Sequence, residues 1–429
     1  MEVLRIEGGN PIEGEVRVCG AKNSALKLMA ATLMAPGITT LTNVPDISDV
    51  HVMGKVLKRL GATVTVAGRH ELVIDTASAD RWETPYELVA KMRASTAVLG
   101  PLISRFGKAV VAMPGGCQIG ARKIDLHLLG LEALGVRFKV DHGYIHADTP
   151  KGLHGAMVTL EFASVGATEN LMMASVHAEG TTTIDNAARE PEIVDLANML
   201  NAMGAKIRGA GSPVIEIEGV EELHPVEHEV VGDRIEAATF LGMAGVGTGP
   251  IHVSGFKPEH LGLVLKKYEQ MGIEVVREKD GATATRIAQR LEPVDIQTLP
   301  FPGFPTDVQA QAMCLLSLSD GDCIVTENVF ENRFMFASEL VRLGADIQVT
   351  GHHAVIHGVE RLSGAQVRAT DLRGGAALAM AGIAAEGYTT ISDIHHIKRG
   401  YEDFVEKLCG LGAIAAIEEV EVDPELAGD

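Results

Sequence analysis

The sequence predicts an α/β protein built from six repeated units, divided three and three between two similar lobes. Two kinds of glycine-containing segment recur in phase along the 429 residues, and repeats of this length decide a fold. In the first kind a glycine precedes β-forming residues, and its six glycines are Gly37, Gly107, Gly180, Gly249, Gly321 and Gly387. In the second kind a glycine follows leucine or methionine, and its six glycines are Gly61, Gly135, Gly204, Gly272, Gly344 and Gly412. Both series repeat about every 70 residues, which predicts six copies of one unit.

Each unit is expected to run strand, helix, strand, strand, helix. The β-branched residues favour the first strand, and apolar residues at three- and four-residue spacing favour a helix, as in residues 190–204. The second glycine would end that helix, because glycine adopts the left-handed C-cap conformation at little cost. The last helix of several units is apolar nearly all round, as in residues 25–35 and 375–385, which is typical of a buried helix. We therefore expect helices inside each lobe and sheets outside, with one sheet face in water.

Six units divide most simply into two lobes with a cleft between them. We expect the first lobe to span residues 22–231 and to carry a loop around Cys117. The second lobe then combines residues 1–21 with residues 232–429 and carries Asp307 and Arg399. The chain would cross between the lobes near residues 228–233.

Composition and charge exclude several classes of protein. The chain has 37 lysines and arginines against 57 aspartates and glutamates, a net charge of −20, and only 4% aromatic residues. Nucleic acids and anionic membrane surfaces are poor partners for such a chain. No strongly apolar run approaches the roughly 20 residues that span a bilayer, and the first ten residues lack a secretory pattern. Five cysteines without a CxxC pair are typical of a reduced, cytoplasmic protein.

One unit carries extra residues around Cys117. Its two marker glycines are 28 residues apart, whereas those of five other units are 23 to 25 apart. The added residues lie in 111–122 (VAMPGGCQIGAR), whose proline and glycines favour an exposed, functional loop. A cysteine between glycines has little core to join, and Arg122 and Lys123 would lower the pKa of its thiol. We expect Cys117 to be chemically active, whereas the other four cysteines lie in regular apolar strands or helices and need only pack.

Lys22 and Asn23 lie where a strand is expected to meet a helix. With Asn23 or Ser24 as the N-cap, free backbone N–H groups of that helix would point outward beside the lysine. Such a helix end next to a cation is an anion-binding site. The alternative is a solvated lysine beside an ordinary cap, and spacing alone leaves both interpretations open.

Arginines recur at predicted helix starts or loop ends of different repeats, namely Arg93, Arg122, Arg333, Arg373 and Arg399. Arginine binds carboxylates and phosphates through two parallel hydrogen bonds. Each one alone is as well explained by a surface ion pair. Their corresponding positions favour convergence on one anion, for which a protein of net charge −20 needs a local positive focus.

Asp307 is the candidate general base. Thr306, followed by Gln309 three residues later, has the pattern of a capping box, which would leave Asp307 free of capping duty. The simpler alternative is a favourable interaction of Asp307 with the helix dipole. The helix dipole would favour the charged carboxylate and so make Asp307 a weaker base, and burial would offset this effect.

Familiar metal and nucleotide motifs are missing from the sequence. The pairs His352–His353 and His395–His396 are adjacent, which is not the spacing of zinc ligands. There is no Walker motif, no GxSxG and no GxGxxG in a βαβ context. The sequence therefore predicts no metal site and disfavours the common NTPases, hydrolases and dehydrogenases.

Taken together, the motifs resemble one enzyme family over nearly the whole chain, from Val3 to about Ile417. The matching segments are GAKNSALK, MRAS, PGGCQIGAR, SVGATEN, NAAREPEIVD, FPTDVQAQ, FENRFM, SGAQV, DLRGGAAL and RGYEDFVEKL. They are similar to those of the UDP-N-acetylglucosamine 1-carboxyvinyltransferases, and PGGC followed by IGAR is the most specific. The resemblance implies the family fold, a two-domain inside-out α/β barrel of six βαββα-type units in two pseudo-threefold lobes.

The resemblance also implies a reaction. The enolpyruvyl group of phosphoenolpyruvate would pass to the 3′-hydroxyl of UDP-N-acetylglucosamine with release of phosphate, the first committed step of peptidoglycan synthesis. The route is addition and elimination through a tetrahedral ketal, without a metal or organic cofactor. By motif match, Cys117 would protonate the methylene carbon and can add to phosphoenolpyruvate covalently, and Asp307 would accept the hydroxyl proton. Closure of the loop 115–120 would exclude water.

The motif match implies the binding residues as well. Lys22, Arg122 and Arg399 would hold the phosphate, so that Lys22 and Arg399 join Cys117 and Asp307 as catalytic residues. Substrate binding would fall to Asn23, Arg93, Arg122, Lys123, Ile124, Asp125, Leu126, Phe162, Ala163, Ser164, Val165, Val329, Arg333 and Arg373. Lys123 stands where the family often has proline and Phe162 where some members have lysine, which affects the expected uridine and diphosphate contacts. Members with Asp in place of the cysteine resist fosfomycin, so Cys117 predicts sensitivity.

Two other functions remain as alternatives. The shikimate-pathway enolpyruvyl transferase shares the fold but lacks the PGGC loop, and the acceptor that supports phosphate release separates the two. A catalytically silent nucleotide-sugar-binding homologue would keep the barrel, although intact Cys117 and Asp307 argue against it. A mere scaffold of repeats is disfavoured, because the cations fall at element ends rather than on a broad face.

Overall fold

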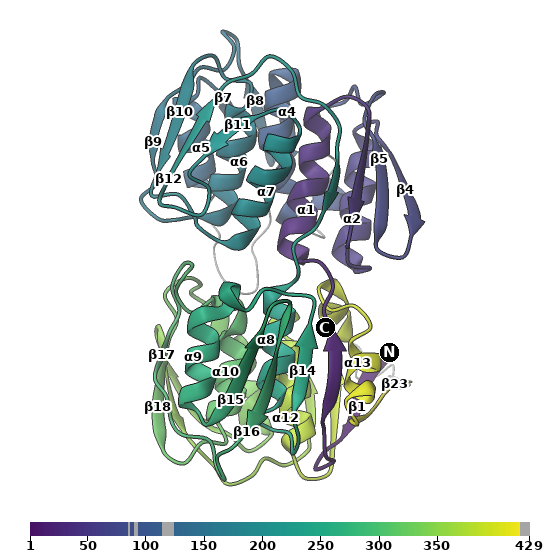
Figure 1. Ribbon diagram of the computed structural model, residues 1–429, viewed down its shortest axis with the longest axis vertical. Helices are drawn as coiled ribbons and strands as arrows, with labels where there is room; N and C mark the ends of the chain where they lie inside the picture. The colour runs from purple at the N-terminus through teal and green to yellow at the C-terminus, as the bar shows by residue number, and fades with distance from the viewer. Residues whose placement is uncertain (85, 90–92, 114–123, 421–429) are drawn as a thin grey trace. The chain divides into compact units, whose positions relative to one another are not determined.

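The computed structural model describes residues 1–84, 86–89, 93–113 and 124–420 (Figure 1). They form two compact units, each with its own hydrophobic core. The first unit contains the described residues between 19 and 232, and the second contains those between 1 and 18 and between 233 and 420. A separate core in each unit is the property that defines a domain.

Three sheets enclose the first unit. Their strand orders are β13-β3-β5-β4, β6-β8-β7 and β9-β10-β12-β11. The strands are β3 (Ile38–Thr42), β4 (Thr63–Gly68), β5 (Glu71–Asp75), β6 (Lys108–Ala112), β7 (Arg137–Asp141), β8 (Tyr144–Asp148), β9 (Met157–Thr159), β10 (Thr181–Asp185), β11 (Lys206–Arg208), β12 (Val214–Glu218) and β13 (Glu227–Glu229). Burial alternates along β12, so that one face of this sheet packs inward and the other meets water, as expected.

Helices fill the interior of the first unit. The last helix of each repeat is almost wholly buried, and these are α1 (Lys22–Ala31), α4 (Leu99–Phe106) and α6 (Val165–Ser175). The first helix of each repeat keeps an exposed face, and these are α2 (Ser48–Arg59), α5 (Asp125–Ala133) and α7 (Pro191–Ala202). Short helical segments are η1 (Thr32–Met34), α3 (Tyr86–Val89) and η2 (Arg93–Val98). Figure 1 shows α1, α6 and α7 between the sheet with β4 and β5 and the sheet with β9 and β10.

The second unit repeats this plan. Its sheets have the orders β2-β14-β16-β15, β17-β18-β20-β19 and β21-β22-β1-β23. The strands are β1 (Glu2–Glu7), β2 (Gly14–Arg17), β14 (Ile251–Ser254), β15 (Ile273–Glu278), β16 (Gly281–Arg286), β17 (Ile296–Gln297), β18 (Asp322–Thr326), β19 (Asp346–Thr350), β20 (His353–His357), β21 (Gln366–Arg368), β22 (Tyr388–Ser392) and β23 (Ile414–Glu419).

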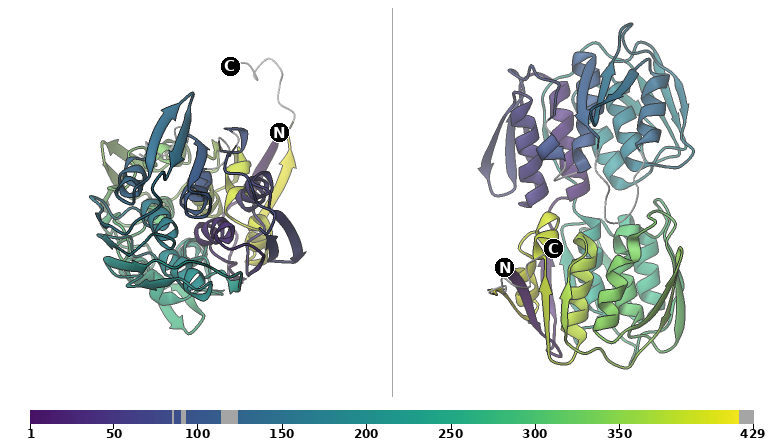
Figure 2. Two further views of the ribbon diagram at one scale, coloured as in Figure 1. Left: turned by 90° about the horizontal axis from the view of Figure 1, so that it is seen from above. Right: turned by 180° about the vertical axis from the view of Figure 1, so that it is seen from behind.

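The inner helices of the second unit are likewise the last of each repeat. They are α8 (Arg234–Met243), α10 (Gln309–Leu316) and α12 (Leu372–Ala384), which contact one another. The remaining helices are η3 (Pro258–Leu261), α9 (Gly262–Gln270), η4 (Thr306–Val308), η5 (Arg333–Phe336), α11 (Ala337–Arg342), η6 (Ile394–Arg399) and α13 (Phe404–Gly410). The view from behind in Figure 2 shows helices of this unit between the sheet that contains β1 and the one that contains β18. Buried helices inside sheets confirm the predicted fold class.

The repeat contains one strand more than the sequence predicts. Five of the six sheets have a short strand parallel to the first strand of the repeat, namely β2, β9, β13, β17 or β21. In the sixth sheet a single bridge from Glu83 to Val110 takes this place. These strands have two to four residues, too few for alternation to show in the sequence. The predicted pattern of strand, helix, strand, strand, helix is therefore incomplete.

The second glycine series closes helices as predicted. The φ angles of these six glycines lie between 87° and 111°, the left-handed region that glycine adopts most readily. The stretch expected to cross between the lobes, residues 228–233, begins within β13 (Glu227–Glu229), which pairs with β3. The chain leaves the first unit only after Gly232. Within the described residues, no helix has both the length and the hydropathy needed to cross a membrane.

Candidate active site

Asp307 lies between two arginines of the second unit. It belongs to the short helix η4, while Arg333 begins η5 and Arg373 lies in the first turn of α12. Arg333 Nη2 donates to Asp307 Oδ1 at 2.9 Å, and Arg373 Nη2 lies 3.6 Å from Asp307 Oδ2. Both arginines are about 3% exposed, whereas the Asp307 side chain keeps 24% of its surface exposed. We call these three residues the Asp307 cluster.

Interactions with Asp371 and Tyr401 hold Arg373 in this cluster. Asp371 is the N-cap of α12, where its Oδ1 accepts hydrogen bonds from the backbone N–H groups of Arg373 and Gly374. The guanidinium lies 5.2 Å from the ring centre of buried Tyr401. Burial by itself lowers the pKa of Arg373, but Tyr401, Asp307 and Asp233 raise it, and the net shift is upward. Arg373 is therefore a permanent buried cation.

Arg373 also keeps donor capacity. Its Nε and Nη1 are buried and have no hydrogen-bond partner among the described residues. Buried polar groups of folded proteins are nearly always paired, so donors left over beside a partly exposed carboxylate are suited to an anionic ligand. Arg333 and Arg373 meet at a carboxylate of the protein itself, and the expected convergence of the arginines on an anionic ligand stays a prediction.

The predicted capping box before Asp307 is wrong. The residue before η4 is Pro305, and no side chain caps this helix. Thr306 Oγ1 instead donates to Glu327 Oε2 at 2.9 Å. The Gln309 amide is fully buried and has no hydrogen-bond partner in the described part of the chain. The pattern failed because the Thr306 hydroxyl donates to a carboxylate 21 residues away, whereas a capping hydroxyl accepts from a backbone N–H group of the helix.

Two further expected residues of the second unit flank this cluster in the fold. Arg399 ends η6, which packs against α12, the helix that carries Arg373. Val329 lies between β18 and η5, and its backbone N–H donates to Glu327 Oε1 at 2.7 Å. The stretch from Val329 to Arg333 therefore leads directly into the Asp307 cluster.

Lys22 is the first residue of α1 in the first unit and is buried. Its Nζ forms an ion pair with Asp49 Oδ2 of α2 at 2.7 Å, and both side chains are at most 10% exposed. The alternative of a solvated lysine is therefore wrong. The predicted N-cap is wrong too, because Ala21 occupies that position and no side chain caps α1. Ser24 Oγ donates to Asp195 of α7 instead.

Asn23 follows Lys22 and connects to a buried acid. The backbone oxygen of Asn23 accepts from Lys27 Nζ at 3.2 Å, and Lys27 Nζ lies 3.0 Å from Glu169 Oε2 of α6. Burial raises the pKa of Glu169 to about 7; Lys27 opposes this, and Glu192 and Glu190 add to it. Glu169 therefore changes its charge near neutral pH.

The residues expected at the nucleotide sugar lie on two packed helices. Ile124, Asp125 and Leu126 stand at the start of α5, and residues 162–165 lead into α6. Ser164 is the N-cap of α6, where its Oγ accepts from the Ala167 N–H at 3.3 Å. A hydrogen bond of 3.0 Å between His127 and Asn170 joins the two helices. Phe162 is 41% exposed, so it is accessible to a ligand.

For four expected residues the structure gives no account of the side chain. Arg93 begins η2, whose backbone packs against α1 and α6. Cys117, Arg122 and Lys123 lie outside the described residues. Lys22, Asn23, 124–126 and 162–165 belong to the first unit, and Asp307, Val329, Arg333, Arg373 and Arg399 belong to the second.

The structure separates the other cysteines into two kinds. Cys314 in α10 and Cys323 in β18 are buried, and burial raises the pKa of each thiol to about 12, which makes them inert. The expectation that all four pack in regular apolar elements is wrong for Cys19, which follows β2 and is half-buried. It is also wrong for Cys409, whose side chain is exposed in α13.

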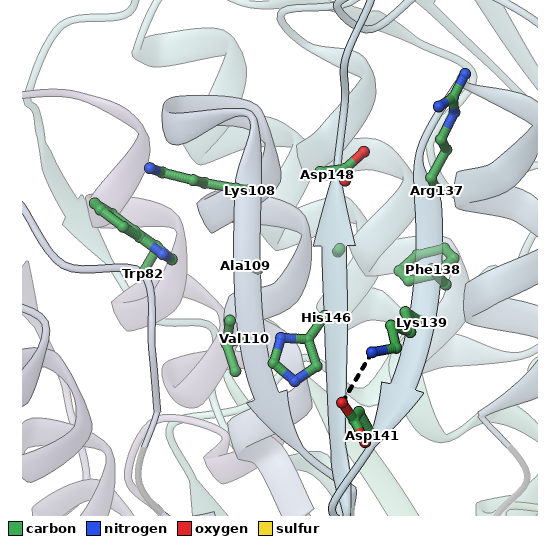
Figure 3. A pocket seen from close by; sticks show the side chains of 11 residues that line it. Trp82, Lys108, Ala109, Val110, Arg137, Phe138, Lys139, Asp141, His146 and Asp148 are labelled. Carbon is green, nitrogen blue, oxygen red and sulfur yellow. Dashed lines mark hydrogen bonds and ion pairs between the residues drawn. The ribbon is translucent and has the colours of Figure 1, made fainter.

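A surface groove of about 360 Å³ in the first unit is lined by none of the expected site residues that the structure describes (Figure 3). It follows β6, β7 and β8, with Trp82 at one side, and Lys108 Nζ lies 3.4 Å from the centre of the indole. Lys139 and Asp141 form an ion pair of 2.9 Å within it. Lys108, Lys139 and Asp141 thus have their partners within the groove itself, and the groove adds no residue to the candidate site.

Sequence reasoning missed the residues that support the site. Asp371 carried a readable signal, since an aspartate directly before an apolar helix is a typical N-cap. Asp49, Tyr401 and Glu327 carried none, because each acts on a residue distant in the sequence. Their roles follow only from the folded chain.

The chain was compared with known proteins. Residues 6–408 match the family described as EPSP synthase (3-phosphoshikimate 1-carboxyvinyltransferase). UDP-N-acetylglucosamine 1-carboxyvinyltransferase 2 of Carboxydothermus hydrogenoformans is 53% identical over 96% of this chain and 98% of its own length. UDP-N-acetylglucosamine 1-carboxyvinyltransferase of Corynebacterium jeikeium is 52% identical over 95% of this chain and 97% of its own length.

Solved structures agree with the fold. The enolpyruvyl transferase NikO of Streptomyces tendae matches with a TM-score of 0.88 and 29% identity, over 97% of this chain and 98% of that chain. EPSP synthase of Acinetobacter baumannii matches with a TM-score of 0.76 over 98% of this chain and 100% of that one, and at 17% identity it supports the fold alone. With relatives more than half identical along nearly the whole length, this chain belongs to the UDP-N-acetylglucosamine 1-carboxyvinyltransferase family of the enolpyruvyl transferases.

Proposed function

We propose that this protein transfers the enolpyruvyl group of phosphoenolpyruvate to the 3′-hydroxyl of UDP-N-acetylglucosamine and releases phosphate. The observation that carries this proposal is 53% identity, over 96% of the chain, to a relative named for that transfer. The PGGCQIGAR and FPTDVQAQ segments support it at the level of motifs. In a cell the reaction would take place in the cytoplasm, as the first committed step of peptidoglycan synthesis, and it would need no metal or organic cofactor.

In the addition step the acceptor oxygen bonds to C2 of phosphoenolpyruvate. Asp307 accepts the proton of the 3′-hydroxyl, and Cys117 delivers a proton to the methylene carbon C3, so that a tetrahedral ketal forms. The Asp307 cluster supports the first of these roles, because two buried guanidinium groups hold the carboxylate in one orientation while part of it stays exposed. The Nε and Nη1 donors of Arg373 are suited to the carboxylate of phosphoenolpyruvate.

In the elimination step a proton leaves the new methyl group and the bond from C2 to the phosphate oxygen breaks. The products are the enolpyruvyl ether and inorganic phosphate. Lys22, Arg122 and Arg399 would stabilise the departing phosphate. The ion pair with Asp49 supports this role for Lys22, since it fixes the ammonium group at the start of α1. Asn23, Arg93, Lys123, residues 124–126 and 162–165, and Val329 would bind the nucleotide sugar.

Phosphate release from phosphoenolpyruvate tests the proposal directly. The purified protein should release phosphate when UDP-N-acetylglucosamine is present and should not do so with shikimate 3-phosphate. Release with shikimate 3-phosphate alone would replace the proposed function by that of an EPSP synthase. No release with either acceptor would favour a silent nucleotide-sugar-binding protein.

Fosfomycin gives a second, independent test of the role of Cys117. Alkylation of the thiol should remove activity progressively with time, and the variant Cys117→Asp should keep its activity under the same treatment. Activity that stays constant in the wild-type protein over hours would contradict the role of the thiol.

A further inference from the structure

Glu327 is a buried carboxylate in the second unit, directly after β18. It is 1% exposed and forms no ion pair within the described part of the chain. A carboxylate without a cation is stable inside a protein only when hydrogen-bond donors surround it. The hydrogen-bond donors around Glu327 therefore indicate which segments of the chain its carboxylate holds in place.

Three donors reach the two carboxylate oxygens. Oε1 accepts from the backbone N–H groups of Val329 at 2.7 Å and Phe330 at 3.0 Å, and Oε2 accepts from Thr306 Oγ1 at 2.9 Å. Hydrogen bonds to a carboxylate are roughly twice as strong as those between neutral groups. The Glu327 side chain thus fixes the backbone of the loop that follows it and also holds Thr306, 21 positions earlier.

The backbone around Glu327 is itself anchored. Its N–H donates to the oxygen of His352 at 2.8 Å, and its own oxygen is 3.2 Å from His352 Nδ1. The next residue, Asn328, donates from its backbone N–H to Thr298 Oγ1 at 3.0 Å. The carboxylate is therefore presented from a rigid base, which is what a positioning group requires.

Both targets of the carboxylate belong to the candidate site. Thr306 directly precedes Asp307, and the loop with Val329 and Phe330 leads into Arg333. Arg333 returns to Asp307 through its hydrogen bond of 2.9 Å. Glu327, Thr306, Asp307, Arg333 and the Val329–Phe330 loop thus form a closed ring of contacts.

We propose that Glu327 is a positioning residue for the transferase reaction, which fixes Asp307 relative to the loop of Val329. This rests on the proposed function, because the roles of Asp307 as base and Val329 as a contact of the nucleotide sugar come from it. One arm of the carboxylate acts through Thr306 on the base. The other arm acts through the two backbone N–H groups on the sugar-binding loop.

The two arms can be separated by kinetics. Thr306→Val removes the hydroxyl and keeps the shape, so it should lower kcat about tenfold while KM for UDP-N-acetylglucosamine changes less than twofold. Thr306→Ser keeps the hydroxyl and should recover kcat to within about threefold. Glu327→Gln weakens both arms, so kcat should fall and KM for the nucleotide sugar should rise at least threefold.

Glu339→Gln is the matched control for a merely structural carboxylate. Glu339 Oε2 accepts a backbone N–H, that of Arg368, at 3.0 Å in the same unit and touches no expected site residue. Its replacement should lower the melting temperature less than Glu327→Gln does, because Glu339 accepts one hydrogen bond and Glu327 accepts three, and it should leave kcat and KM unchanged. The double variant Thr306→Val with Glu327→Gln should lose no more kcat than the worse single variant, because both substitutions act on the same hydrogen bond between Thr306 and Glu327.

Failure of this inference differs from failure of the function. If wild-type protein turns over and the Thr306 and Glu327 variants keep its kcat and KM, or their losses in kcat multiply independently, Glu327 has no positioning role. If wild-type protein shows no phosphate release with UDP-N-acetylglucosamine, the proposed function fails, and the role of Glu327 fails with it.

Discussion

At the scale of single residues, the Asp307 cluster is a partly exposed carboxylate held by two buried guanidinium groups. Arg333 and Arg373 are each about 3% exposed, so both guanidinium groups have lost most of their water. The cost of burying Arg373 is offset by Asp307 and by the aromatic face of Tyr401. The Asp307 side chain keeps 24% of its surface exposed, and the Nε and Nη1 donors of Arg373 have no hydrogen-bond partner among the described residues.

Replacing Asp307 by asparagine should lower kcat by a factor of about 10²–10⁴, the usual contribution of a general base. The amide keeps the shape but cannot accept the hydroxyl proton. The measurement is the steady-state rate of phosphate release with saturating substrates. Asp320→Asn, which breaks an exposed ion pair with Arg290, serves as the control and should leave kcat unchanged. An Asp307→Asn variant within threefold of wild type would exclude Asp307 as the base.

Glu169 should make the stability of the first unit depend on pH. In the folded protein burial raises its pKa from the ordinary value of 4.5 to about 7, so the unfolded chain loses this proton at lower pH than the folded one. The contribution of the neutral side chain is therefore fully present below pH 4.5 and is lost as the pH rises to about 7. The loss is at most about 3 kcal/mol.

Urea unfolding between pH 5 and 8 measures this dependence on Glu169. Glu169→Gln cannot ionise, so its stability should fall less over this range than that of wild type. Glu161→Gln, an exposed position in the loop before α6, is the control and should follow wild type. Parallel curves for wild type and Glu169→Gln would show that Glu169 does not titrate in this range.

At the scale of elements, the space around a helical glycine depends on what its helix packs against. Gly100 in the inner helix α4 donates its N–H to Asn170 Oδ1 of α6 at 2.7 Å. A Cβ at position 100 would lie only 2.6 Å from the backbone oxygen of Asn170. Gly54 in the outer helix α2 would place a Cβ 3.7 Å from Val64, an ordinary contact. The same residue type is required in one helix and replaceable in the other.

Alanine at these two glycines should therefore have opposite effects. Gly100→Ala forces α4 and α6 apart and should destabilise the protein by about 1–3 kcal/mol or more. Gly54→Ala should stabilise it by about 0.5–1 kcal/mol through helix propensity. Thermal and urea unfolding of both variants provide the test. A neutral Gly100→Ala variant would mean that the contact between α4 and α6 is looser than the structure shows.

At the scale of the whole molecule, each unit has a core of its own. All described residues of the first unit come from one part of the chain, between 19 and 232, whereas those of the second come from two parts. Three sheets around buried helices give the first unit all the elements of an independent domain. Its stability need not depend on the rest of the chain.

A fragment of residues 19–232 should consequently fold alone. We expect a cooperative thermal transition by circular dichroism and dispersed amide resonances, as for other domains of this size. The fragment lacks Asp307, Arg333 and Arg373 and should release no phosphate. A gradual, non-cooperative transition would show that the first unit needs the second one to fold.

The repeat pattern, the glycines that end the first helix of each unit, and the burial of the last helix in each unit were predictable from the sequence. These features depend on neighbours within one turn or one strand, so periodicity and glycine positions are sufficient to predict them. The short edge strands were not predictable, because two to four residues carry no period. The candidate residues came from motifs, and the sequence did not indicate that Asp307 would meet Arg333 and Arg373.

The sequence by itself determined the sixfold repeat, the buried helices and the family. Only the tertiary structure decided that Thr306 bonds Glu327 rather than capping a helix, that Lys22 pairs with Asp49, and that Glu169 shares Lys27 with Asn23. The physical reason is range: helix and strand signals act between near neighbours. The partner of a buried charge is whichever group the packed elements bring within about 3 Å, however far away it lies along the chain.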